Sequence, residues 1–138
     1  MSLLWSPPDG LAQIGWRRIG LTALAFCLVP AVLGAAIVLL TRVTGPRLLG
    51  QDHLWVEGVA TLAMISPLVM APIWAIVAFG TAALLRLGRY GWLATATLGL
   101  LAFLPMARTE VGTICLPFGA TAVLLYRMAL ALQRPEAI

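Results

Sequence analysis

The one dense group of residues whose chemistry could support binding or proton transfer follows the first long apolar segment. Asp52, His53 and Glu57 lie there, and Glu110 lies in a later polar segment. His53 and Glu57 are four residues apart, so an early helix start would place them on one face, which Glu110 could approach. Such an outer-face polar cluster could bind a cation or relay protons. The alternative, which we favour, is a set of solvated loop residues with one surface ion pair, worth about 0–1 kcal/mol.

Other chemistry has little support in the residue pattern. Cys27 and Cys115 lie inside apolar segments at different expected depths, so we expect no disulfide. A single loop histidine cannot supply the axial pair of a membrane haem. The sequence has no glycine-rich phosphate loop after a strand and no nucleophile paired with a base. We therefore expect no cofactor, no bound metal and no catalytic activity. An enzyme that acts on a lipid-soluble substrate through His53, Glu57 and Glu110 is kept as an alternative.

Composition indicates which elements must position these residues. Of the 138 residues, 62% are hydrophobic and 10% are charged. A soluble domain carries roughly 25% charged and 45–50% apolar residues, so the apolar excess has no aqueous surface to occupy. A membrane crossing takes about 20 residues. The composition therefore predicts a small polytopic membrane protein, and the length favours four crossings.

Four apolar segments, separated by short polar ones, agree with that number. We predict membrane-spanning helices over 19–41, 59–85, 91–106 and 111–132. The remaining segments are a lead-in (1–18), an outer loop (42–58), an inner loop (86–90), a second outer loop (107–110) and a tail (133–138). The predicted fold is all-α, a single integral membrane domain over 1–138 in which four helices form an antiparallel bundle.

Two of these segments carry further signals. The second is long, about 40 Å as a helix, and Pro67 and Pro72 each remove a backbone donor, so we predict a kinked helix. The first is too long for the roughly 7–15 apolar residues of a signal peptide, so we predict an anchor. Before it, Ser6 and Pro7 resemble the cap and first position of a helix, which would make the lead-in interfacial. An unstructured lead-in is the alternative.

The arginines predict the orientation. With four crossings both termini lie on one side, and that side holds six arginines whereas the other holds three. The six are Arg17, Arg18, Arg86, Arg89, Arg127 and Arg134, and the three are Arg42, Arg47 and Arg108. The positive-inside rule then makes both termini cytoplasmic, in a bacterial inner membrane. The basic residues are scattered rather than gathered in one patch, so we expect no nucleic-acid partner.

Small residues at helical spacing predict where the helices pack. Hydrophobic burial does not bring helices together in lipid, so close backbone contact must do so. The second apolar segment carries Ala71, Ala75, Ala78 and Ala82, and the fourth carries Gly112 and Gly119. Each stripe offers a face on which a neighbouring backbone can approach.

The functional prediction follows from what the apolar segments lack. All charged residues are expected at the membrane interfaces or beyond, whereas ion-coupled transporters usually carry an ionisable group within the membrane. We therefore predict a non-catalytic accessory or assembly subunit of a larger membrane complex. Its partners would be the lipid bilayer and other membrane subunits or a second copy of the chain. The alternative is a small channel or carrier whose path runs between protomers or at the kinked second helix.

Overall fold

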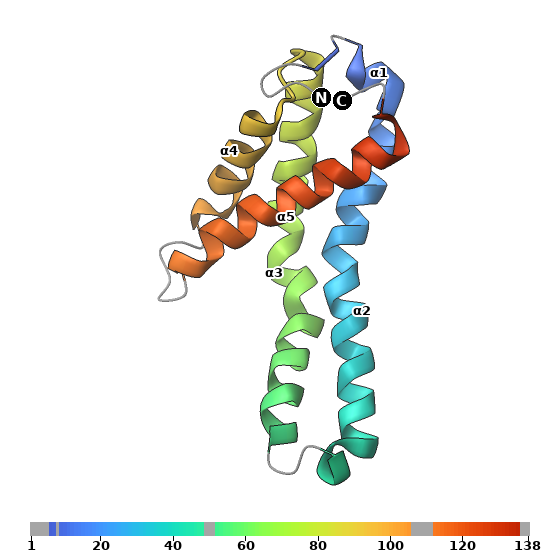
Figure 1. Cartoon of the computed structure of the whole chain (residues 1–138), viewed down its shortest axis with the longest axis vertical. Coiled ribbons are helices and arrows are strands. Elements are labelled where there is room, and N and C mark those ends of the chain that lie inside the picture. The colour runs from blue at the N-terminus through green and yellow to red at the C-terminus, as the bar shows by residue number, and fades with distance from the viewer. Residues whose placement is uncertain (1–5, 8, 49–51, 106–111, 136–138) are drawn as a thin grey trace. The chain divides into compact units, whose positions relative to one another are not determined.

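A computed structural model of the chain describes residues 6–7, 9–48, 52–105 and 112–135, and all regular elements in those ranges are helices (Figure 1). In chain order they are α1 (Gly10–Ile14), α2 (Trp16–Leu48), α3 (His53–Arg86), α4 (Trp92–Phe103) and α5 (Gly112–Gln133). The all-α prediction is confirmed over the described residues.

Three of the helices are long and apolar enough to cross a membrane. These stretches are Trp16–Thr44, His53–Arg86 and Leu116–Gln133. By contrast, α4 has 12 residues and rises only about 18 Å, less than the ~30 Å of a hydrocarbon core. A short 3₁₀ turn at Leu104 and Pro105 follows it, because proline cannot donate the next helical hydrogen bond.

Helices α2 and α3 extend beyond the apolar segments that predict them. α2 has 33 residues and α3 has 34, or about 50 Å each. Thr41 and Thr44 lie inside the helix, and their hydroxyls donate to the carbonyls of Ile37 and Leu40, both at 2.9 Å. Polar side chains that bond to their own helix in this way do not end it. The sequence boundaries therefore mark the change in hydropathy and not the ends of the helices.

The chain forms two compact units. Unit 1 comprises residues 1–23 and 73–138, and unit 2 comprises residues 24–72. Unit 1 holds α1, the first residues of α2, the last part of α3, and all of α4 and α5. Unit 2 is a hairpin made of the remaining parts of α2 and α3.

Unit 2 is held by a close approach of two helices. Gly34 is buried, and a Cβ added there would lie 2.8 Å from the backbone nitrogen of Met64. The buried thiol of Cys27 lies 4.0 Å from the carbonyl oxygen of Pro67. Small side chains thus let α2 and α3 pack backbone to backbone.

In unit 1, α4 and α5 pack in the same manner, but polar contacts are added. A Cβ on Gly99 would lie 2.8 Å from the Cα of Ala120. The hydroxyl of Tyr126 donates to the carbonyl of Ile19 at 3.0 Å, which joins α5 to the start of α2. Gly88, with a φ of +64°, ends α3 in a Schellman motif in which the Arg89 amide donates to the Leu84 carbonyl at 2.9 Å.

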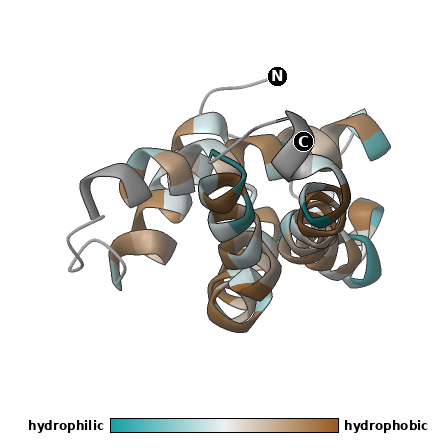
Figure 2. Ribbon diagram, turned by 90° about the horizontal axis from the view of Figure 1, so that it is seen from below, coloured by the Kyte–Doolittle hydropathy of each residue, from teal (hydrophilic) through white to brown (hydrophobic). Residues whose placement is uncertain are grey.

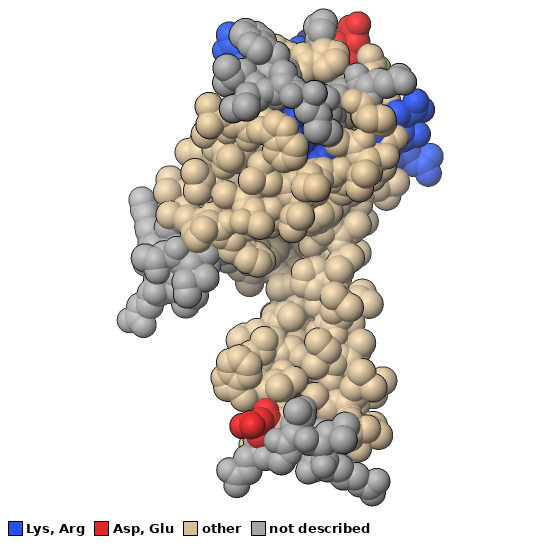
Figure 3. Space-filling model, viewed as in Figure 1, with Lys and Arg blue, Asp and Glu red and all other residues tan. Residues whose placement is uncertain are grey.

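The surface of both units is apolar. Hydrophobic residues occupy several sides of the helices (Figure 2), and the face in Figure 3 has long stretches without a charged residue. Leu62 is 72% exposed in unit 2, and Leu132 is 85% exposed in unit 1. Contiguous exposure of this kind is rare on a protein surrounded by water. These surfaces are those of a chain that can reside in lipid.

Candidate functional site

The predicted outer-face polar cluster is not assembled as a ligand set in the described residues. The carboxylate of Glu57 accepts a hydrogen bond from Nε of Arg42 at 2.8 Å, in an ion pair between α3 and α2. Asp52 is exposed and His53 is half-buried at the start of α3. Glu110 lies outside the described residues. Within the described ranges no three His, Cys, Asp or Glu side chains are grouped to hold a metal ion.

The most unusual polar group in unit 1 is the side chain of Arg127, which is 0% exposed. It lies on α5, six residues before the helix ends at Gln133, or about 9 Å along the axis. One guanidinium nitrogen donates to the carbonyl oxygen of Tyr90. The same nitrogen lies 3.3 Å from the hydroxyl oxygen of Thr95. The remaining two nitrogens, Nε and the second terminal one, make no hydrogen bond to the described residues.

Two aromatic rings stack on this cation. The guanidinium carbon of Arg127 lies 5.0 Å from the ring centroid of Tyr90 and 4.7 Å from that of Trp92. Each contact is within the ~6 Å range of a cation–π interaction, which is worth more when water is excluded. We call Arg127, Tyr90, Trp92 and Thr95 the Arg127 cluster.

The start of α4 positions three members of this cluster. Gly91 is the N-cap, with an extended φ of −86° and ψ of 174°. The amide and the hydroxyl of Thr95 both donate to the carbonyl oxygen of Gly91, at 3.0 Å and 2.8 Å. The Tyr90 amide donates to the hydroxyl oxygen of Ser6 at 3.2 Å, and the Ser6 amide donates to the Gly88 carbonyl at 3.0 Å. The N-terminal segment thus fixes the connector that holds Arg127.

This use of Ser6 corrects a sequence prediction. Ser6 was expected to cap a helix that begins at Pro7, but α1 begins at Gly10 and its N-cap is Asp9. Ser6 is buried, and its hydroxyl oxygen accepts a hydrogen bond from the amide of Tyr90, 84 positions away. The alternative of an unstructured lead-in does not hold for the described part of 1–18 either, because α1 buries Gly10 and Ile14.

The phenol of Tyr90, in the connector between α3 and α4, is fully buried. Burial raises its pKa to about 12, although the nearby Thr81 hydroxyl, the Arg127 charge and the Thr95 hydroxyl each act in the opposite direction. The hydroxyl of Tyr90 is therefore neutral at physiological pH, and it does not neutralise the arginine.

The structure adds burial to the predicted position of Arg127. The sequence predicts it with the interfacial arginines, and the structure buries its side chain inside unit 1, against the connector that is predicted at the same interface. Among the described residues no carboxylate pairs with it, since the ion pair found there joins Arg42 to Glu57. The sequence signal for this burial was the position of Arg127, six residues before the end of an apolar helix. A guanidinium keeps its proton at physiological pH, so the geometry suits a structural clamp better than a proton relay.

The predicted packing residues have mixed surroundings. Ala82 and Gly119 are buried, and a Cβ on Gly119 would lie 2.7 Å from the Cβ of Phe103. Ala78 is half-buried, whereas Ala71 and Ala75 are exposed. Gly112 is the first residue of α5, and Pro67 and Pro72 both lie inside the continuous helix α3.

We compared the chain with known proteins. No family model, curated protein or solved structure matches it. The function is therefore inferred from the contacts and surfaces of the chain itself.

Proposed function

We propose that this chain is a multi-pass protein of the bacterial inner membrane and a non-catalytic accessory or assembly subunit of a larger complex. The observation that carries the proposal is the exposed part of the alanine stripe on α3. Ala71 in unit 2 and Ala75 in unit 1 are each exposed, and each small side chain would let another backbone approach closely. Lipid chains gain little from such a face, whereas a partner helix gains close packing.

The Arg127 cluster supports a structural role over a catalytic one. Its guanidinium is held by the Tyr90 carbonyl and two aromatic rings, and it is closed off from solvent. A group fixed in this way can stabilise the connector before α4, but it has no access to a substrate. A partner would therefore bind on the surface of this protein and not in its interior.

The topology of four crossings with cytoplasmic termini belongs to the same proposal. Contacts within unit 1 support it, because Ser6 bonds to the α3–α4 connector and Gln133, the last residue of α5, bonds to Thr22 near the start of α2 at 3.2 Å. The N-terminal segment, the inner connector and the end of α5 would then share one side. The proposed crossing at α4 rests on the apolar segment 91–106, since the helix itself rises only about 18 Å.

Extraction of the chain from its native membrane in mild detergent tests the subunit role. We expect it to migrate in a species larger than the monomer. The substitutions Ala71→Leu and Ala75→Leu should release the monomer, because the larger side chains would prevent a partner helix from approaching closely. Val69→Phe is the matched control, since Val69 is 53% exposed and lies about 200° around the helix from Ala71.

Three outcomes would contradict parts of the proposal. Wild-type chain that migrates only as a free monomer would overturn the subunit role. Flux in proteoliposomes that contain the purified chain alone would favour the channel or carrier instead. A fluorescent protein fused after Ile138 should fluoresce, as it folds in the cytoplasm, and a dark fusion would overturn the orientation.

A further inference from the structure

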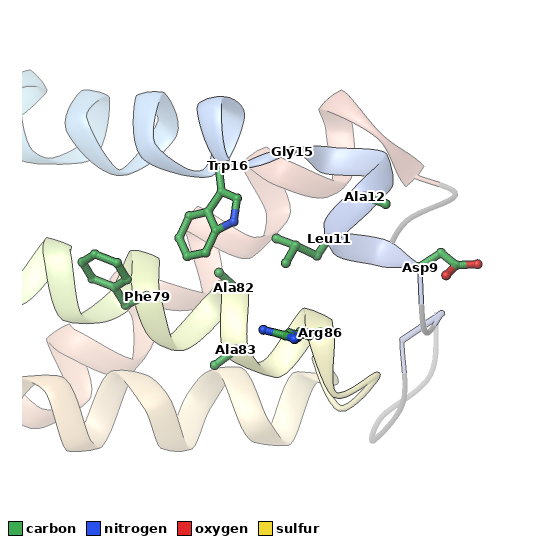
Figure 4. A pocket seen from close by; sticks show the side chains of 9 residues that line it. All are labelled: Asp9, Leu11, Ala12, Gly15, Trp16, Phe79, Ala82, Ala83 and Arg86. Carbon is green, nitrogen blue, oxygen red and sulfur yellow. The ribbon is translucent and has the colours of Figure 1, made fainter.

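Unit 1 contains a groove between its N-terminal segment and the last turns of α3 (Figure 4). Its volume is about 740 Å³, within the roughly 300–1,000 Å³ of sites that take small molecules. Leu11 of α1, Trp16 of α2 and Phe79 of α3 provide apolar walls, and Ala82 lies at its buried side. Arg86, the last residue of α3, lines the groove at its charged end.

The groove is a built feature of unit 1. Gly15 has a φ of +76°, which lets the chain turn sharply between α1 and α2. The rings of Trp16 and Phe79 meet edge to face, with centroids 5.8 Å apart and planes at 63°. Because Ser6 is bonded to the α3–α4 connector, α1 is anchored from both ends and forms a fixed wall.

Its charges favour an anion. Figure 4 shows the guanidinium of Arg86 over the apolar lining, whereas the carboxylate of Asp9 points away from it. Arg86 makes no ion pair with the residues that the structure describes. Of the seven charged residues described in unit 1, six are arginines and Asp9 is the exception.

We propose that this groove binds an anionic phospholipid, with the phosphate on Arg86 and the start of an acyl chain along Leu11, Trp16 and Phe79. An arginine that terminates a spanning helix lies at the depth of lipid phosphates, and a guanidinium binds phosphate through paired hydrogen bonds. Trp16 is of the type that favours the headgroup zone. The inference requires membrane residence only, so it is independent of the proposed subunit role.

Native mass spectrometry of the full chain, purified and stripped of lipid in mild detergent, tests the site. The probes are phosphatidylglycerol and phosphatidylcholine with identical acyl chains. We expect tighter retention of phosphatidylglycerol, and Arg86→Gln should weaken it about fivefold, the effect of one arginine near an anionic lipid. Arg89→Gln is the matched control, because Arg89 is exposed three residues later and does not line the groove.

A second pair of variants tests the cavity without changing charge. Ala83 lines the groove and is exposed, so Ala83→Trp should fill the space and reduce retention of both lipids. Leu87→Trp, at an exposed position outside the groove, should leave retention unchanged. Equal losses in Arg86→Gln and Arg89→Gln would show diffuse attraction and overturn the proposal. So would equal retention of the two lipids by the wild type, or full retention by Ala83→Trp.

Discussion

The two units join their helices by different means. Unit 2 is a hairpin in which Gly34 allows α2 and α3 to approach, and its described ion pair, Arg42 with Glu57, is on the surface. Unit 1 combines glycine contacts with a buried arginine and with hydrogen bonds that join residues more than 100 positions apart, such as Tyr126 and Ile19. We therefore expect side-chain size to matter most at the helix contact of unit 2, whereas the interior of unit 1 depends on both size and polar pairing.

Magnitudes sharpen this contrast. An interhelical hydrogen bond in a membrane protein contributes on average about 0.6 kcal/mol, with a maximum near 1.7 kcal/mol. The bonds of Tyr126 and Gln133 therefore add little singly. The large terms in either unit are steric, through cavities and overpacking, or come from a buried charge. The substitutions that distinguish the units should act on those terms.

The largest effect is expected for Arg127→Ala in unit 1. The substitution empties a fully buried site and leaves the carbonyl of Tyr90 without its donor. The free energy of unfolding should fall by about 3–4 kcal/mol, from the cavity and the orphaned acceptor together. Titration with SDS in mixed micelles measures this quantity, and hydrogen exchange should speed up in α4 and α5 more than in residues 24–72.

Arg134→Ala is the control, since Arg134 is exposed beyond the end of α5. It should change the free energy of unfolding by no more than about 0.5 kcal/mol. If Arg127→Ala proved as mild as the control, the Arg127 cluster would not be what stabilises unit 1, and the contrast between the units would fail.

The next effect lies in unit 2, at the helix contact. Gly34→Ala would place a methyl group against the backbone of Ala60 and Met64, which cannot move aside as a side chain can. We expect a loss of about 2 kcal/mol in the same SDS titration. Gly58→Ala should be neutral or stabilise by roughly 0.5–1 kcal/mol, because a Cβ there meets nothing within 4 Å and alanine favours helix. The reverse order would show that the hairpin is not closely packed at Gly34.

These contacts also show what could be predicted from the sequence. Hydropathy identified the helical class and the three long spans, because a run of apolar residues determines both. It did not set the helix ends, since Thr41 and Thr44 satisfy their hydroxyls within the helix and let α2 continue. The apolar segment 91–106 is likewise longer than the 12-residue helix inside it, which gives way to a 3₁₀ turn at Pro105.

The polar interior was harder to predict, because its partners are far apart in the chain. Ser6 and Tyr90 are 84 positions apart, and Arg127 and Tyr90 are 37 apart, so no local spacing relates them. For the outer-face polar cluster, we favoured solvated residues with one surface ion pair over a ligand set based on the spacing of His53 and Glu57. In the structure Glu57 pairs with Arg42, which is 15 positions earlier on the facing helix.

A smaller effect is expected where the N-terminal segment joins the rest of unit 1. Ser6→Ala removes the hydroxyl that accepts the Tyr90 amide and leaves that buried donor unpaired. The cost should be about 1 kcal/mol, with faster hydrogen exchange at Tyr90 as the direct measurement. Ser6→Thr retains an acceptor oxygen and should restore the slow exchange. Unchanged exchange in Ser6→Ala would show that the N-terminal segment does not protect the connector.

The smallest effect belongs to the ion pair of unit 2. The side chain of Arg42 is 70% exposed and that of Glu57 is 25% exposed, so water competes for both groups and salt screens their attraction. Glu57→Gln should lower the free energy of unfolding by about 0.5 kcal/mol or less, and by still less at high salt. Pairing it with Arg42→Gln in a double-mutant cycle isolates the interaction. A coupling above about 1.5 kcal/mol would mean that electrostatics contributes as much to the hairpin as the Gly34 contact does, and unit 2 would then resemble unit 1.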